Sequence, residues 1–149
     1  MSDNPYHGYI SSLLSCYQQA ASMQPSPTSL QNQLPVSASA PRVVILAPHP
    51  DDECVMGGLP LRLRREAGCK VITLPVTLGR NPQRKEERKK ELQDACDSLG
   101  FSLGEIIQLG LDMINPAARQ SNPENWKSSV NALAAALEKY APSILFFPN

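Results

Sequence analysis

The chain has 149 residues, with 14 basic and 14 acidic side chains, two histidines and four cysteines. Its zero net charge and pI near 6.7 argue against the broad basic surface of a nucleic-acid-binding protein. The sequence contains no run of about 18 apolar residues, and its first 23 residues lack the basic and apolar regions of a secretory signal. We therefore expect no transmembrane segment and a cytoplasmic location.

Residues 1–41 are predicted to be an N-terminal extension. They hold one charged side chain, Asp3, and five of the 14 prolines. The apolar spacing in residues 9–17 predicts a short amphipathic helix, and the Ser, Pro and Gln content of residues 24–41 is typical of a flexible linker. We expect a tether or a packing helix here; docking onto a partner is the alternative.

Strand and helix signals alternate in residues 42–149, which we expect to form one domain. Short apolar runs predict strands at 43–47, 70–77, 106–109 and 144–147, with Pro75 near the end of its strand. Amphipathic patterns predict helices at 57–67, 84–99 and 124–140. The predicted inner faces of the last two helices are Leu92, Ala95, Cys96 and Leu99, and Trp126, Val130, Leu133, Ala134 and Leu137. This order indicates an α/β fold with a Rossmann-like parallel sheet and flanking helices.

The residues that follow the first strand carry the clearest chemical signal. Ligands of parallel sheets bind beyond the carboxyl ends of the strands, and one imidazole and three carboxylates stand there in His49-Pro50-Asp51-Asp52-Glu53. Imidazole and carboxylate are both zinc ligands. From a turn, His49 and Asp52 can converge on one ion while Asp51 faces the bound water. The alternative is an acidic helix cap in which His49 is only hydrogen-bonded.

A family resemblance starts from the same residues. The segment 47–53, Ala-Pro-His-Pro-Asp-Asp-Glu, followed by Gly57-Gly58, closely resembles the signature of the PIG-L/LmbE family of zinc-dependent N-deacetylases. Weaker similarities at 76–79, 88–100 and 109–112 extend the resemblance over residues 42–149. The resemblance implies that His49 and Asp52 bind Zn²⁺ or another divalent metal and that Asp51 is the general base.

Three further residues receive roles from this resemblance. Arg88 would orient the substrate, although it stands in the charged run 84–91, which is typical of a solvated helix face. Asp112 would bind a sugar hydroxyl; its alternative is an ordinary turn acid. Glu53 would orient the loop or a metal ligand. We expect Cys54 to pack at the start of a helix and not to bind metal.

The implied reaction is hydrolysis of the N-acetyl group of a small amino-sugar substrate that contains N-acetylglucosamine. The family supplies a third metal ligand, a histidine, after the fourth strand, whereas the second histidine of this chain is His7 in the extension. We therefore expect residues 42–149 to be the N-terminal portion of such a domain, truncated after the fourth strand and lacking part of the active site. The uncovered fourth strand would favour self-association. The alternatives are a related amide hydrolase acting on a sugar conjugate, or a non-catalytic α/β module that binds a ligand through Arg88 and Asp112.

Overall fold

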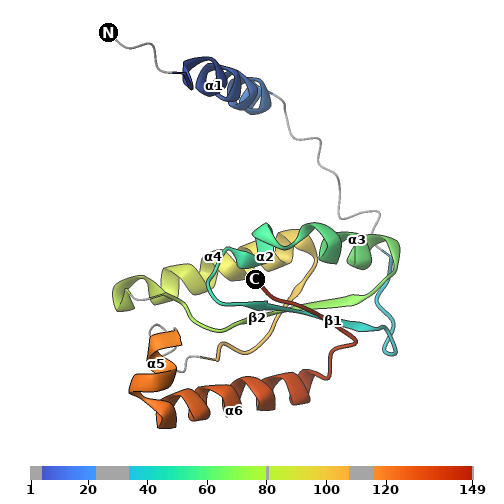
Figure 1. The fold of residues 1–149 in the computed structure, drawn as a ribbon. Coiled ribbons are helices and arrows are strands. Elements are labelled where there is room, and N and C mark those ends of the chain that lie inside the picture. Colours follow the sequence, from blue (N-terminus) through green and yellow to red (C-terminus); the bar gives the residue numbers. More distant parts are fainter. Residues whose placement is uncertain (1–4, 23–33, 80, 108–115, 149) are drawn as a thin grey trace. The chain divides into compact units, whose positions relative to one another are not determined.

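The computed structural model describes residues 5–22, 34–79, 81–107 and 116–148, which fall into two compact units, Met1–Gln31 and Asn32–Asn149. The first unit contains helix α1 (His7–Ser22), which confirms the predicted helix and is longer than the sequence pattern indicated (Figure 1). Among the helices described, none has the length and apolar content needed to cross a membrane.

The second unit is built on a four-stranded parallel sheet, as predicted. Its strands are β1 (Arg42–Ala47), β2 (Lys70–Pro75), β3 (Ser102–Leu103) and β4 (Ile144–Phe146), in the order β3-β2-β1-β4. Val43 of β1 is in register with Val71 of β2 and Ile144 of β4. The continuous apolar run of β1 fits this central position, because such a strand is covered on both faces.

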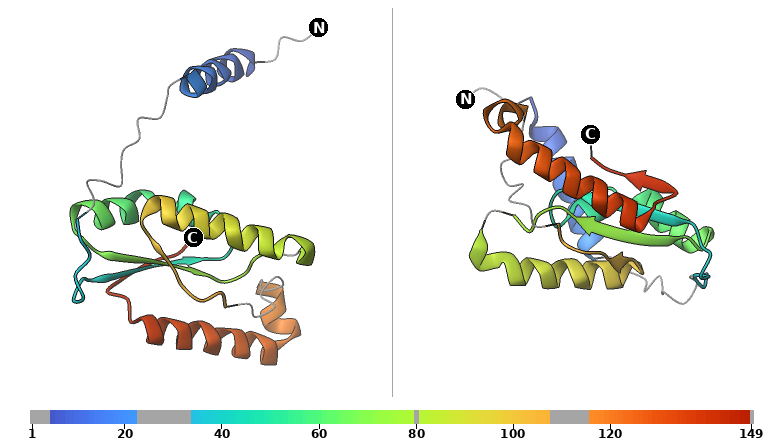
Figure 2. Two further views of the ribbon diagram at one scale, coloured as in Figure 1. Left: turned by 180° about the vertical axis from the view of Figure 1, so that it is seen from behind. Right: turned by 90° about the horizontal axis from the view of Figure 1, so that it is seen from below.

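Helices cover both faces of the sheet (Figures 1 and 2). One layer contains α2 (Asp52–Val55), α3 (Gly58–Glu66) and α4 (Lys85–Leu99), which follows the short 3₁₀ helix η2 (Pro82–Arg84). The other contains α5 (Pro116–Ser121) and α6 (Pro123–Tyr140). Alternate residues of β1 therefore enter different cores: Val43 and Ile45 pack with Leu92, whereas Val44 packs with Ala136.

Helix α4 confirms its prediction closely. Leu92 and Cys96 are buried, and Ala95 and Leu99 are half-buried. The helix ends at Gly100, whose φ of 71° is the left-handed conformation that glycine adopts without a side-chain penalty.

The predicted strand at 106–109 is wrong in position. The strand is Ser102–Leu103, and residues 108 and 109 lie outside the described part of the chain. Beyond it, the Gly104 amide still donates to the Thr73 carbonyl at 2.8 Å, but the Glu105 amide donates to the Tyr140 hydroxyl at 2.9 Å. The Ile107 amide in turn donates to the Pro75 carbonyl at 3.0 Å, so residues 104–107 still lie beside β2 without forming a regular strand.

The predicted inner stripe of α6 is also partly wrong. Val130 and Ala134 are exposed, whereas Ser129 and Ala136 are buried. Small side chains allow the helix to approach the sheet closely, and the Ser129 hydroxyl donates to the Asn125 carbonyl at 2.9 Å, so its burial leaves no polar group unpaired.

Candidate active site

The strand order changes direction at β1, because β2 pairs with one side of β1 and β4 with the other. This arrangement places a topological switch point at the carboxyl end of β1. From β1 the chain continues to β2 on one side, and β4 returns on the other side. The segment His49-Pro50-Asp51-Asp52 leaves β1 at this point and enters α2. Open α/β sheets bind their ligands at such positions, so the fold places the predicted cluster where a site is expected.

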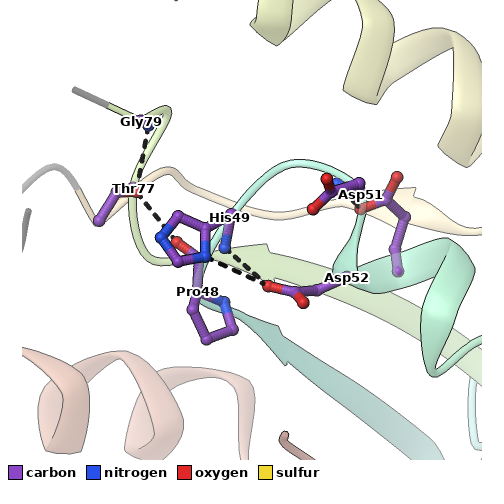
Figure 3. Close-up of polar contacts among 7 residues, drawn as sticks. Pro48, His49, Asp51, Asp52, Thr77 and Gly79 are labelled. Carbon is purple, nitrogen blue, oxygen red and sulfur yellow. Dashed lines mark hydrogen bonds and ion pairs between the residues drawn. The ribbon is translucent and has the colours of Figure 1, made fainter. Parts of the chain in front are cut away.

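His49 and Asp52 are brought together by the turn before α2 (Figure 3). The backbone amide of His49 donates to Asp52 Oδ2 at 2.8 Å, and the same oxygen lies 3.8 Å from His49 Nδ1. The His49 side chain is 63% exposed and that of Asp52 is 20% exposed. The carboxylate is thus fixed by the backbone while the imidazole faces solvent, so a ligand can reach both groups.

Asp51 lies between these residues in an unfavourable backbone conformation. Its φ of 125° and ψ of −25° are rarely adopted by residues with a side chain. Its side chain is exposed and lies to one side of the His49–Asp52 pair (Figure 3). Within the described residues its carboxylate accepts no hydrogen bond, so its oxygens are available to take a proton.

The Glu53 side chain is hydrogen-bonded to the Asp51 backbone. This glutamate is 2% exposed, and its Oε2 accepts the Asp51 amide hydrogen at 2.9 Å. Gly57 keeps the loop tight, because a Cβ at that position would clash with the backbone oxygen of Glu53. A buried carboxylate that holds a strained backbone fits the supporting role proposed for Glu53 from the sequence.

Cys54 lies in α2 and is exposed, so the prediction that it packs at the start of a helix is wrong; its environment is also not that of a metal ligand. Its Sγ donates to Glu53 Oε1 at 3.5 Å. Partial burial of the thiol raises the pKa of Cys54, and the Glu53 and Asp51 charges raise it further. The protonated thiol is therefore favoured over the thiolate that binds metals.

Thr77 and Gly79 support the site, a role that was not predicted for either residue. Thr77 Oγ1 donates to the Pro48 carbonyl at 3.0 Å and accepts the Gly79 amide hydrogen at 3.1 Å (Figure 3). The residue before His49 is thereby tied to the segment after β2. A threonine two residues before a glycine at a strand end was the available signal, because such hydroxyls often close turns.

Arg88 reaches the same end of the sheet from α4. It is half-buried within a mostly exposed charged run, and its guanidinium lies against Gly79: a Cβ built there would be 3.3 Å from Nη1. In the described ranges Arg88 has no hydrogen bond or salt bridge, whereas Arg84 pairs with Glu87 and Glu91. Arg88 thus differs from a simple solvated charge. Asp112, the other predicted substrate residue, lies outside the described residues.

The donor pair fits zinc in its chemistry, since a neutral imidazole and a carboxylate are both common zinc ligands. Taking only the residues that the structure describes, no group of three or more His, Cys, Asp or Glu side chains is arranged to hold a metal ion. His49 and Asp52 therefore account for two of the three protein ligands that catalytic zinc sites usually have.

Comparisons with known proteins agree with this fold and motif. A family model described as GlcNAc-PI de-N-acetylase (PIG-L) matches residues 44–149. A search of curated proteins found no match. A similar solved structure is described as a crystal structure of a deacetylase–teicoplanin complex in the biosynthesis pathway of teicoplanin; it is 16% identical, with a TM-score of 0.52. The alignment covers 71% of this chain and 57% of that one, so the chain spans little more than half the length of this structure. This likeness supports the fold, and the family match, which begins within β1 and runs through β4, shows that the chain belongs to the GlcNAc-PI de-N-acetylase (PIG-L) family.

Proposed function

We propose that this chain carries the metal-binding and general-base residues of a hydrolase that removes the N-acetyl group from an N-acetylglucosamine-containing molecule. The observation that carries the proposal is the approach of His49 Nδ1 to Asp52 Oδ2, 3.8 Å apart at the switch point of the sheet. The family match over residues 44–149 supports it and indicates a de-N-acetylase reaction. We further propose a cytoplasmic location.

His49 and Asp52 would hold a zinc ion or a similar divalent cation. When bound, zinc lowers the pKa of a water molecule toward about 7 and polarises an amide carbonyl. In the protein, the contact between the His49 amide and the Asp52 carboxylate fixes one donor before the metal arrives, which reduces the entropy lost on binding.

Asp51 would act as the general base. Its exposed carboxylate would take a proton from the water that attacks the acetyl carbon, and it would return that proton to the nitrogen when the carbon–nitrogen bond breaks. The products are acetic acid and a free amine; one hydrogen of the water forms the new N–H bond and the other stays on the acid, so no other reactant is needed. The hydrogen bond from the Asp51 amide to Glu53 would keep the base in place during both transfers.

Arg88 would orient the substrate through the guanidinium that lies against Gly79. A half-buried cation that makes no hydrogen bond in the described ranges, although its charge acts on Glu87, retains its hydrogen-bonding capacity for a ligand, such as a sugar hydroxyl or an anionic substituent. Asp112 keeps its proposed role at a sugar hydroxyl.

Asp51→Asn tests the chemistry, because it removes the base and leaves both proposed metal ligands. We expect zinc content to be unchanged and turnover of an N-acetylglucosamine glycolipid, followed as amine release, to fall by about 10²–10⁴-fold. Full activity in this variant would reject Asp51 as the base. Binding of the glycolipid by the wild-type chain without any acetate release would favour the non-catalytic binding module.

A further inference from the structure

Thr77 uses one hydroxyl to join two segments of the candidate active site. Its Oγ1 donates to the Pro48 carbonyl and accepts the Gly79 amide hydrogen (Figure 3). Pro48 immediately precedes His49, the proposed metal ligand. Gly79 lies against the guanidinium of Arg88, the proposed substrate-binding cation. The hydroxyl of Thr77, a buried residue, therefore stands between the metal-ligand turn and the substrate cation.

The hydroxyl bond to Pro48 adds to main-chain contacts that already pair this part of the chain. Beyond the paired ends of β1 and β2, the Val76 amide donates to the Ala47 carbonyl at 2.7 Å. The Thr77 amide donates to the Pro48 carbonyl at 3.1 Å. These backbone bonds do not use the Thr77 side chain, so they persist when it is replaced. The hydroxyl occupies the second acceptor position of the Pro48 carbonyl and extends the contact to Gly79.

Gly79 brings the backbone close to Arg88. Its φ of 84° lies in the left-handed region, and a Cβ at this position would be closer to Arg88 Nη1 than in an ordinary contact. Leu78, which precedes Gly79, is buried in the same core as Leu92. Leu92 follows Arg88 by one turn on the same face of α4. The segment that Thr77 begins is thus packed against the helix face that carries Arg88.

We propose that Thr77 is a positioning residue of the deacetylation site, whose hydroxyl sets the separation between the metal-ligand turn and Arg88. The inference rests on the proposed function, in which His49 and Asp52 hold the metal while Arg88 orients the same substrate. The two groups act on one molecule, and displacements of about 1 Å can reduce a rate by about 100-fold. Groups that hold metal ligands in place typically change metal affinity or activity by about 10–100-fold when removed.

Packing is the alternative role for Thr77, and two substitutions separate it from positioning. Thr77→Val keeps the branched shape of the buried side chain but removes the hydroxyl. Thr77→Ser keeps the hydroxyl but removes a methyl group. Positioning predicts that serine preserves function and valine does not, whereas packing predicts the reverse order. Ser129→Ala is the matched control, because it removes another buried hydroxyl, bonded to the Asn125 carbonyl within α6.

Zinc affinity and steady-state kinetics of the full chain test the proposal. Thr77→Val should weaken zinc binding, measured by competition with a chelating dye, by about tenfold and lower kcat/KM for the glycolipid by about 10–100-fold. Thr77→Ser and Ser129→Ala should stay within about twofold of the wild type, because both keep the two bonds of the Thr77 hydroxyl. The rise in KM caused by Thr77→Val should disappear in an Arg88→Ala background, because it acts through Arg88.

Thermal unfolding shows which variants are folded. Thr77→Ala, which also lacks the hydroxyl, takes the place of Thr77→Val if valine prevents folding, and the same losses are expected.

Other results would overturn the proposal. These are unchanged zinc affinity and kcat/KM in Thr77→Val, a larger loss in Thr77→Ser than in Thr77→Val, or additive effects of Thr77→Val and Arg88→Ala on KM. Equal losses in Ser129→Ala would assign the effect to general stability. If the wild type binds zinc and deacetylates and Thr77→Val matches it, the role of Thr77 is rejected and the proposed function stands. A wild type with neither zinc nor activity rejects the proposed function and this role with it.

Discussion

Removing the Glu53 carboxylate is expected to release the Asp51 backbone from its strained conformation. A hydrogen bond to a charged acceptor contributes about 1.5–3 kcal/mol, which is comparable to the roughly 1–3 kcal/mol cost of an unfavourable φ, here 125°. Loss of about 2 kcal/mol in Glu53→Ala should shift the loop toward relaxed conformers by about 30-fold. The change in global stability should be smaller, because the substitution also removes the desolvation cost of a buried carboxylate.

Amide hydrogen exchange at Asp51, measured by NMR, reports this shift without requiring activity. Glu53→Ala should reduce protection of the Asp51 amide by about 30-fold, whereas Glu53→Gln should retain most of it through the amide oxygen. Cys54→Ala is the matched control, since it removes only the 3.5 Å contact to the other glutamate oxygen. Unchanged exchange in Glu53→Ala would refute the reasoning.

The same substitution to glutamine provides a second readout at Cys54. Burial is the largest cause of the raised pKa of this thiol, and the Glu53 charge adds to it. Neutralising Glu53 lowers the pKa of Cys54, increases the thiolate fraction at a fixed pH and should therefore accelerate alkylation, measured by mass spectrometry. Slower alkylation in Glu53→Gln would contradict the assigned role of the charge.

Two further pairs of substitutions, each with its control, test the site and the fold. Arg88→Ala should raise the KM for the glycolipid by about 10–100-fold with unchanged zinc content, as expected for loss of a charged hydrogen bond. Lys89→Ala, at the exposed neighbouring position, should have little effect on KM. Equal KM values for the two variants would argue against substrate binding by Arg88. Gly100→Ala should lower the free energy of unfolding, measured by thermal unfolding, by about 1–2 kcal/mol, because the φ of residue 100 is 71°. Gly58→Ala, at a helical position with open space around the added Cβ, should be neutral or stabilising in the same assay. A loss at Gly58 equal to that at Gly100 would show that the left-handed conformation is not the cause.

The elements that the sequence predicted well are those whose signals are local. The apolar run of β1, the end of α4 at Leu99 and the sheet class follow from residue patterns alone, and the structure confirms them. Pro75 also ends its strand as predicted. The short α2 and α5 were not predicted, because four- and six-residue helices contain too few turns for a periodic pattern.

The errors arise where tertiary contacts override local pattern. β3 is short: of residues 104–107, only the Gly104 and Ile107 amides donate to β2, while the Glu105 amide donates to the Tyr140 hydroxyl 35 residues away. The inner face of α6 combines the small buried residues Ser129 and Ala136 with the half-buried Leu137 and Tyr140, and the small residues give too weak an apolar signal to be predicted. Similarly, the approach of His49 to Asp52 was predictable from their spacing, but the strained Asp51 backbone and the Thr77 link to Pro48 required coordinates.

The central claim is that His49 and Asp52 form a metal site, and zinc stoichiometry tests it most directly. Wild-type protein and Asp51→Asn should each retain about one zinc per chain after dialysis that removes loosely bound ions, as measured by elemental (inductively coupled plasma) mass spectrometry. His49→Ala and Asp52→Ala should lose it while keeping their thermal unfolding transition. Absence of stoichiometric zinc from the wild type, or its full retention when both His49 and Asp52 are replaced, would contradict the account.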